Sequence, residues 1–440
     1  MLSHSKKDSL LEAARIRPVG KVARVTGLQL EIEGVSAAIG DLVMVRRDDE
    51  MMEAEVVAIR EGRLICSPYG HLRGLRFGSD AIPAGRPAVI RVGEQLLGRV
   101  VDARGNPIDD GPALTVGDLV TIHGEPPAPL SRGAIASQLP LGVRAIDTMI
   151  PCGVGQRLGI FAGSGVGKST LLSMIARGTN ADVNVVALIG ERGREVSEFI
   201  NNDLGPEGLA RSIVVVATSD EPALVRIRAS MTATRIAEWF RDHGKRVVLM
   251  MDSLTRLAMA QREVGLSAGE PPATRGYPPS AFALLPKLLE RAGNSEKGSI
   301  TGLYTVLVDG DEMNEPISDA ARSILDGHIV LSRRLATSGH YPAIDVLESV
   351  SRLEGAILSP ERRALVYQAR SRLASYREAR DLIEVGAYQR GSSREIDLAI
   401  ASKGAIDQFL RQTMDDAADV DEAFQRLSQL LDETSVGIGR

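Results

Sequence analysis

The sequence predicts an α/β protein in three parts: a small N-terminal β-barrel, a central parallel-sheet domain and a helical C-terminal domain. Short strand patterns punctuated by glycines fill residues 18–90, and strand patterns alternate with helical patterns over 91–352. Over 353–440 the patterns are helical only. With 440 residues, 44% of them hydrophobic, the chain is long enough for about three domains with cores of their own.

The barrel prediction rests on evenly spaced strand patterns. They cover 21–25, 28–32, 42–45, 55–59 and 63–66. Closure into a barrel removes exposed strand edges, which is why such a series favours a barrel over an open sheet. Residues 1–17 form a separate N-terminal helical extension of only about two turns, which is marginal alone. This extension is either a frayed end or a segment that a partner orders.

In the central part, strands are predicted at 157–161, 183–189, 213–217, 246–251 and 303–308, with a long helix over 221–243. Such open sheets bind ligands at the carboxyl ends of their strands. In the C-terminal part, Ser392 and Glu395 are spaced as a capping box that starts a helix after a glycine break.

A glycine-rich stretch after the first of these central strands predicts a phosphate-binding loop. Its glycines let successive N–H groups point into one concavity at the start of a helix, where a polyphosphate sits. Lys168 would reach the outer phosphates, and the Ser169 hydroxyl would ligate Mg²⁺. A glycine turn that merely caps a helix is the alternative, but the order of strand, loop, Lys-Ser and apolar helix favours the phosphate loop. The residues predicted to hold the nucleotide here are Ala162, Gly163, Ser164, Gly165, Val166, Gly167, Lys168, Ser169 and Thr170.

Two carboxylates follow central strands and are candidates for hydrolytic chemistry. Asp252 ends the apolar strand at 246–251, a position from which a carboxylate holds Mg²⁺ through its water shell. Capping the next turn is its alternative role. Glu191 follows the strand at 183–189 on the same sheet edge, where it would orient or deprotonate a water. From spacing alone, Glu191 could equally belong to an exposed charged turn without a catalytic role.

Composition limits the classes of function. The net charge of −5 and the aromatic content of 3% argue against a nucleic-acid-binding surface. Two cysteines, Cys66 and Cys152, make no disulfide framework and match no metal-ligand spacing. Neither a signal peptide nor a run of about 18 apolar residues is present, so we expect a cytoplasmic protein with at most peripheral membrane contact.

Four separated motifs resemble those of the catalytic subunits of rotary ATP synthases and their relatives. They are the segments 165–168, 190–195, 246–252 and 342–351, and they occur in the same domain order. The resemblance implies a RecA-like central domain that hydrolyses ATP with Mg²⁺. It also implies a homo-hexamer, because each site is completed by the next subunit.

The resemblance assigns further roles residue by residue. Glu191 would be the catalytic carboxylate, and Arg192 and Glu195 would support the phosphate and metal shell. Asp252 and Glu195 would contact Mg²⁺ through water. Tyr341 would stack on adenine, and Arg352 would be the arginine finger given to a neighbouring subunit. A packed loop aromatic and a surface ion pair are the structural alternatives for Tyr341 and Arg352.

Two segments, 269–280 and 288–293, resemble the export ATPases of type III secretion. The stretch 251–263, read with 272–275, leans towards the flagellar form over the virulence injectisome form. This branch implies contacts with a stator-like regulatory protein at the N-terminus, a central stalk protein near 275–279, export substrates and their chaperones, and the membrane export gate. A rotary synthase subunit and a ring-shaped nucleic-acid translocase are the competing hypotheses. The export-type loop argues against the first, and the few aromatics of 18–90 argue against the second.

Overall fold

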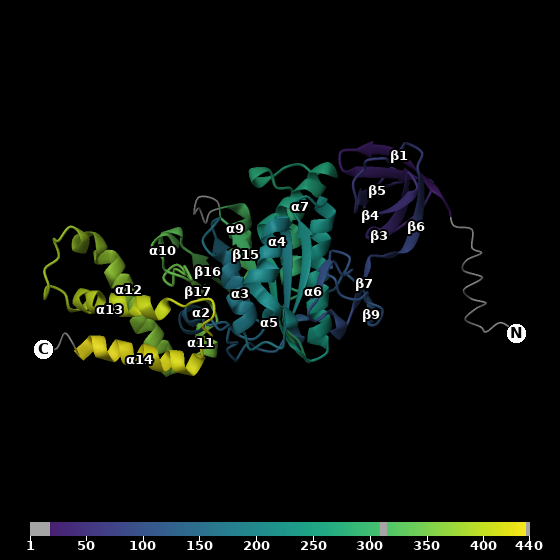
Figure 1. The fold of residues 1–440 in the computed structure, drawn as a ribbon. Helices are drawn as coiled ribbons and strands as arrows, with labels where there is room; N and C mark the ends of the chain where they lie inside the picture. The colour runs from purple at the N-terminus through teal and green to yellow at the C-terminus, as the bar shows by residue number, and fades with distance from the viewer. Residues whose placement is uncertain (1–17, 309–314, 437–440) are drawn as a thin grey trace.

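The computed structural model describes residues 18–308 and 315–436, and the predicted extension at 1–17 lies outside the described residues. Figure 1 shows three parts in a row: strands β1 to β6 at the N-terminal end, a central sheet between helices, and a group of helices at the C-terminal end. The predicted order of barrel, parallel sheet and helical domain is therefore confirmed. No helix among the described residues is long and apolar enough to cross a bilayer.

The N-terminal part is a closed, antiparallel barrel with strand order β1-β2-β5-β4-β3-β6. Alternate side chains point inward and form a separate core that includes Val22, Ile32 and Val45, all 0% exposed. The last strand was missed in the sequence because Pro83, Gly85 and Pro87 give it the composition of a loop. The strands are β1 (Gly20–Thr26), β2 (Gln29–Glu33), β3 (Asp41–Arg47), β4 (Glu50–Arg60), β5 (Arg63–Pro68) and β6 (Asp80–Pro87).

The central sheet has the order β17-β16-β10-β15-β13-β11-β12-β8, with β14 on β15. All neighbouring pairs are parallel except β16 with β17 and β14 with β15. Its strands are β8 (Val100–Asp102), β10 (Arg157–Ala162), β11 (Val183–Glu191), β12 (Ser212–Thr218), β13 (Arg246–Asp252), β14 (Gly293–Asn294), β15 (Ser299–Leu307), β16 (Gly327–Leu331) and β17 (Val350–Ser351). A two-stranded sheet of β7 (Val89–Val92) and β9 (Asp118–Thr121) follows the barrel.

Helices cover both faces of the central sheet, which explains its unbroken apolar strands. In β11, Val185 and Ala187 belong to the core under one layer, whereas Val186 and Leu188 belong to the core under the other. The first layer holds α6 (Ala223–Asp242), α7 (Leu254–Ser267), α8 (Pro279–Leu289) and α9 (Pro316–Ile324). The second begins with α2 (Arg144–Met149), α3 (Lys168–Gly178), α4 (Gly193–Glu198), a π-helix (Phe199–Leu204), α5 (Gly205–Ala210) and α10 (Arg333–Thr337).

The C-terminal helices pack on this second core and extend it. Val366, Phe409 and Leu427 lie in the same buried cluster as Leu171 of α3. The predicted capping box is displaced by one residue: the hydroxyl of Ser393, not of Ser392, accepts the backbone N–H of Ile396. The Ser392 hydroxyl instead donates to the Gln389 carbonyl. These helices are α11 (Glu354–Ile357), α12 (Pro360–Glu384), α13 (Arg394–Leu410) and α14 (Val420–Val436).

Candidate active site

The glycine-rich loop connects the end of β10 to the start of α3. Gly165 and Gly167 have φ angles of 75° and 92°, a left-handed conformation that residues with a Cβ adopt only at a cost. The loop thereby turns its backbone around the N-terminus of α3, whose first N–H groups have no partner within the helix. Ala162 and Val166 are each 1% exposed and pack into the core below the loop.

A cavity of about 510 Å³ opens above this loop, and we call it the phosphate-loop cavity. Of the predicted nucleotide-binding residues, the cavity wall includes Gly163, Ser164, Gly165, Gly167, Lys168, Ser169 and Thr170. Glu191, Arg192 and Glu195 lie in the same wall. Residues from two separate motifs of the sequence thus meet in one cavity.

A buried cation lies between two carboxylates at this edge of the sheet. The Lys168 Nζ is 2.5 Å from an Asp252 oxygen and 3.3 Å from a Glu191 oxygen. The three side chains are 12%, 3% and 14% exposed. Burial by itself would lower the pKa of Lys168, but the two carboxylates outweigh it and raise that pKa. The lysine is therefore a permanent positive charge in a poorly solvated site.

Glu191 is the last residue of β11. Burial raises the pKa of its carboxyl group, and the nearby charge of Asp252 and a hydrogen bond with Glu195 act in the same direction. Lys168 opposes this rise only in part. A carboxyl group whose pKa is moved towards neutral pH is a better proton acceptor than an ordinary surface glutamate.

Asp252 ends β13 and is 2% exposed. Its Oδ1 accepts a hydrogen bond of 2.7 Å from the Thr305 hydroxyl as well as the contact from Lys168. Its alternative role as a cap falls to Ser253, whose side chain accepts the backbone N–H of Arg256 at the start of α7. Asp252 is thus held by side chains from β15 and α3 and is not a cap.

The donor set fits Mg²⁺. Carboxylate and hydroxyl oxygens, from Asp252, Glu191, Glu195 and Ser169, are ligands that this ion prefers. Within the described residues, no three His, Cys, Asp or Glu side chains are grouped as a metal cage. Mg²⁺ is commonly held by one or two carboxylates, substrate phosphates and water rather than by such a cage.

Arg192 and Glu195 lie at the rim of the phosphate-loop cavity. The Arg192 Nη1 is 3.1 Å from the Glu195 Oε1, and the Arg192 side chain is 73% exposed. Arg194 and Glu198 extend this rim with an ion pair of 2.6 Å. Because the rim is solvated, its side chains are free to follow a ligand without leaving a buried charge unpaired.

Tyr341 marks a second cavity, of about 660 Å³, which shares Gly167 and Thr170 with the first. We call it the Tyr341 cavity. The ring is 46% exposed and packs against Gly167, at which an added Cβ would lie 3.5 Å from it. A flat group attached to phosphates in the first cavity would reach this ring, so the two cavities together have the layout of a nucleotide site.

Arg352 is not brought into either cavity. Ser351 pairs with Gly327 at the start of β16, so Arg352 lies at the sheet edge where the parallel strands begin. The phosphate loop lies at the opposite edge, about 20 Å away for a strand of this length. The exposed Arg352 side chain donates to the Arg322 carbonyl at 3.1 Å.

Sequence reasoning missed Arg256 and Asp203 in the wall of the phosphate-loop cavity. The Arg256 Nε is buried and has no hydrogen-bond partner in the structure. Its position four residues after Asp252, in the first turn of the following helix, is the signal that would have found it. No pattern in the sequence marks Asp203, which the π-helix places in the cavity wall.

Gln412 was also missed, and it connects the helical domain to the Tyr341 cavity. Its backbone N–H donates to the Tyr341 carbonyl at 3.0 Å. Its buried side chain accepts the Arg144 backbone N–H at 2.8 Å and donates to the carbonyls of Gly142 and Asp416 at 2.8 and 2.7 Å. The loop between α13 and α14 carries no periodic pattern, so the sequence gives no signal for this residue.

A phosphate loop with a lysine between two carboxylates, on a parallel sheet between a barrel and a helical domain, defines a nucleoside-triphosphate hydrolase. Residues 142–351 match the profile of the ATP synthase alpha/beta family nucleotide-binding domain. Residues 358–429 match that of the T3SS EscN ATPase C-terminal domain.

Individual relatives match almost the whole chain. A flagellum-specific ATP synthase from Bacillus subtilis (strain 168) is 52% identical over 97% of this chain and 99% of its own length. A type 3 secretion system ATPase from Xanthomonas euvesicatoria is 48% identical over 98% of both. The assembled ATPase EscN of the enteropathogenic E. coli type III secretion system superposes with a TM-score of 0.88, at 44% identity, over 94% of this chain and 100% of that one.

The protein belongs to the type III export branch of the ATP synthase alpha/beta family, which confirms the family resemblance of its motifs.

Proposed function

We propose that the protein is a Mg²⁺-dependent ATPase of a type III protein export apparatus and that it serves flagellar export. The observation that carries the hydrolytic part is the buried cluster of Lys168, Glu191 and Asp252 beside the phosphate loop. High identity to a flagellum-specific relative over nearly the full length supports the export part. We retain the domain boundaries 18–90, 91–352 and 353–440 as part of this proposal.

Each residue of the cluster has a separate task in hydrolysis. Lys168 binds the outer phosphates and neutralises charge that builds up on them. Glu191 orients the attacking water and accepts its proton as the bond between the terminal phosphorus and ADP breaks. Asp252 and Ser169 would hold Mg²⁺, with Glu195 and Arg192 at the rim. When bound, Mg²⁺ supplies further charge neutralisation on the phosphate oxygens.

The test of the chemistry is ATP turnover by Glu191→Gln. This change keeps the shape of the side chain but removes the proton acceptor, so we expect turnover to fall by about 10²-fold or more. ATP binding should stay within a few-fold of wild type. Glu207→Gln, an exposed change on α5, is the matched control. Steady turnover by Glu191→Gln at the wild-type rate would remove Glu191 from the proposal.

We propose further that the active form is a homo-hexamer in which Arg352 acts on the neighbouring site. The support is its position: Arg352 is exposed at the sheet edge opposite its own phosphate loop, so it serves a site only in trans. An arginine finger contributes roughly 10³ to 10⁵ in turnover. Tyr341 would stack on the adenine of ATP within each subunit.

Mixing two inactive variants tests the finger. Lys168→Ala removes phosphate binding but keeps Arg352, and Arg352→Ala keeps the phosphate site but removes the finger. We expect each alone to be nearly inactive and a mixture to recover part of the activity, because some interfaces then hold an intact site and an intact finger. Wild-type turnover by Arg352→Ala alone, or no recovery after verified subunit exchange, would contradict the proposal.

The export proposal includes partners that belong to the cytoplasmic face of the secretion machine. EscN is described in complex with its central stalk EscO, and it superposes on this chain with a TM-score of 0.87. We propose an equivalent stalk contact near Arg275, which has a left-handed φ of 48° in an exposed loop. A stator-like protein at the N-terminus, export substrates with chaperones, and peripheral contact with the inner-membrane export gate complete the proposal.

Complementation separates the flagellar from the injectisome role. A strain that lacks this protein is complemented with wild type, Lys168→Ala or Glu207→Gln, and its filaments are counted. We expect filaments with wild type and Glu207→Gln and none with Lys168→Ala. Normal filaments without any complementation would exclude flagellar export and favour the injectisome.

A further inference from the structure

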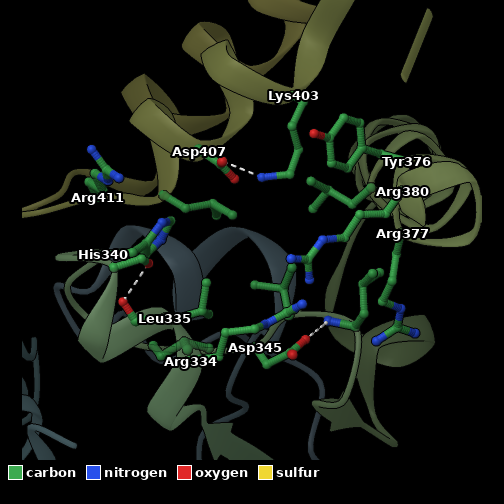
Figure 2. Close-up of a pocket in the computed structure, with 16 residues that line it drawn as sticks. Arg334, Leu335, His340, Asp345, Tyr376, Arg377, Arg380, Lys403, Asp407 and Arg411 are labelled. Carbon is green, nitrogen blue, oxygen red and sulfur yellow. Dashed lines mark hydrogen bonds and ion pairs between the residues drawn. The ribbon is translucent and has the colours of Figure 1, made fainter. Parts of the chain in front are cut away.

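A third cavity, of about 280 Å³, lies between the nucleotide-binding and helical domains. One wall comes from α10 and the segment 340–347, and the other comes from α12 and α13. Figure 2 shows Arg334, His340 and Asp345 on the first side and Tyr376, Lys403 and Asp407 on the second. We call it the interdomain cavity. None of the roles assigned above uses it.

His340 is the buried polar group of this cavity. It is 3% exposed, and its Nε2 is buried without a hydrogen-bond partner. Burial lowers the pKa of His340, and Arg411 and Lys403 lower it further while Asp407 opposes them. The imidazole is therefore neutral at pH 7, and His340 lies in the cavity wall with one buried ring nitrogen that has no partner.

The charges around the cavity are unequal. Three of its cations have acidic partners: Lys403 with Asp407, Arg377 with Glu348 at 2.6 Å, and Arg380 with Glu384 at 2.7 Å. Arg334 and Arg411 form no side-chain hydrogen bond or ion pair with any described residue. The remaining acid, Asp345, accepts backbone N–H groups at 3.1 and 3.2 Å. The cavity therefore has two exposed guanidinium groups without an acidic partner, one from each domain, against the single negative charge of Asp345.

The rest of the lining is apolar. It includes Leu335, Ile344, Leu373 and Leu410, with Tyr376 beside them. Water alone would leave these apolar side chains uncovered. An apolar wall with a few convergent polar groups and a net positive charge is the pattern of a small-molecule site for an anion.

We propose that the interdomain cavity binds a small organic anion, in which an apolar body lies on the leucines and a carboxylate or phosphate faces the arginines. The His340 imidazole would donate one hydrogen bond to an oxygen of this ligand. Arg411 also lines the Tyr341 cavity and precedes Gln412, and His340 precedes Tyr341. A bound anion therefore contacts His340 and Arg411, the residues next to Tyr341 and Gln412. It would change ATP affinity from outside the nucleotide site.

Ligand-observed NMR on the full chain tests the site with benzoate, phenyl phosphate and neutral benzamide as probes. We expect benzoate or phenyl phosphate to bind at least 10-fold more tightly than benzamide, and the stronger of the two identifies the preferred head group. The double variant Arg334→Ala/Arg411→Ala should lose at least 10-fold in anion affinity. Arg390→Ala removes an exposed arginine outside the cavity and should bind as wild type does.

Two further measurements separate this site from the nucleotide site. Lys168→Ala should bind benzoate as wild type does, because the phosphate loop is not involved. Benzoate should also shift the ¹⁵N resonance of the His340 imidazole, which reports directly on the interdomain cavity. Equal binding of benzoate and benzamide, unchanged binding by the double variant, loss of binding in Lys168→Ala, or an unmoved His340 resonance would each overturn the proposal.

The effect on ATP has its own measurement. ATP affinity is compared with and without saturating benzoate, and we expect a change of about fivefold, the size of a typical coupling between sites. Arg334→Ala/Arg411→Ala should abolish this change. An unchanged ATP affinity in wild type would overturn the coupling and leave the binding measurement to decide the site. Neither test requires ATP turnover. The anion-binding proposal can therefore be tested even if the proposed export function is wrong, and the two failures can be told apart.

Discussion

Both edges of the central sheet carry a cation that contacts two carboxylates, but the two groups differ in burial and in what surrounds them. At the edge where strands end, one lysine lies between Glu191 and Asp252 in the wall of a cavity. At the edge where strands begin, Arg157 contacts Glu290 at 2.5 Å and Asp326 at 3.1 Å, and none of the three lines a cavity described above. Similar charges therefore border a cavity at one edge and pack within the fold at the other.

The difference teaches that access, not charge alone, separates a reactive cluster from a structural one. Burial would lower the pKa of Arg157, but its two carboxylates outweigh this and raise it, as they do for Lys168. The direction of the pKa shift is thus the same at both edges. Only the edge with the cavity leaves room for phosphates to exchange with the carboxylates as partners of the cation.

The largest effect is expected from Lys168→Ala. It removes the charge that neutralises the phosphates, so ATP turnover should fall by roughly 10³-fold or more. Stability should fall as well, because Asp252 and Glu191, whose side chains are 3% and 14% exposed, lose their shared cation. Steady-state turnover and urea unfolding measure the two effects. Turnover within 10-fold of wild type would contradict the comparison.

Arg157→Ala should lower stability without lowering ATP affinity. It leaves Asp326 without its cation, whereas Glu290, which is 41% exposed, keeps Arg132 at 3.0 Å, so the loss of stability should be about 1–3 kcal/mol. Unfolding of the nucleotide-binding domain in urea should therefore move to clearly lower concentrations. ATP affinity of the folded protein, measured by titration, should stay within twofold. A large loss of ATP affinity without a loss of stability would remove the distinction between the two edges.

Asp147 offers a buried carboxyl group without any cation. It is 0% exposed, and burial raises its pKa from 3.8 to about 7 although the Leu141 backbone N–H donates to it. A carboxyl group whose pKa is raised in the folded state lowers the free energy of unfolding of the protein as pH rises towards that pKa. Between pH 5 and pH 8 wild type should therefore lose about 2–3 kcal/mol relative to Asp147→Asn. Urea unfolding of both proteins across this range measures the difference, and parallel pH curves would contradict it.

The smallest effect is expected from Gln412→Ala, at the junction with the helical domain. Three side-chain hydrogen bonds are lost, and the loop that positions the Tyr341 carbonyl becomes less fixed. We expect the KM for ATP to rise about 10-fold, equivalent to about 1.4 kcal/mol, with kcat within twofold. Gln425→Ala, on the exposed side of α14, is the control. A fall in kcat at unchanged KM would place Gln412 in a different role.

Much of this arrangement could be predicted from the sequence because it depends on local order. The phosphate loop, Glu191 and Asp252 each follow an apolar strand, and parallel strands bring their carboxyl ends to one edge. Strand β6 could not be predicted, because its prolines and glycine resemble a loop and only barrel closure selects it.

The junction with the helical domain could not be predicted either. Gln412 and Arg144 are 268 residues apart, and their hydrogen bond depends on the packing of α13 against α2. His340 is a similar case, since the α12 and α13 residues around it are distant from it in the sequence. The Ser392 error has a smaller cause: adjacent serines are equivalent in pattern, and only the backbone geometry at Ser393 selects one of them.

The position of Gln412 has a consequence for how the protein is made. The phosphate loop is complete once residue 170 has been synthesised, but the wall of the Tyr341 cavity needs residues 408–416. A nascent chain that has folded only its nucleotide-binding domain therefore has a phosphate loop without the loop that supports Tyr341. Because domains fold in order during translation, tight ATP binding should appear late on the ribosome. We therefore expect the helical domain to delay tight ATP binding until the rest of the subunit is present.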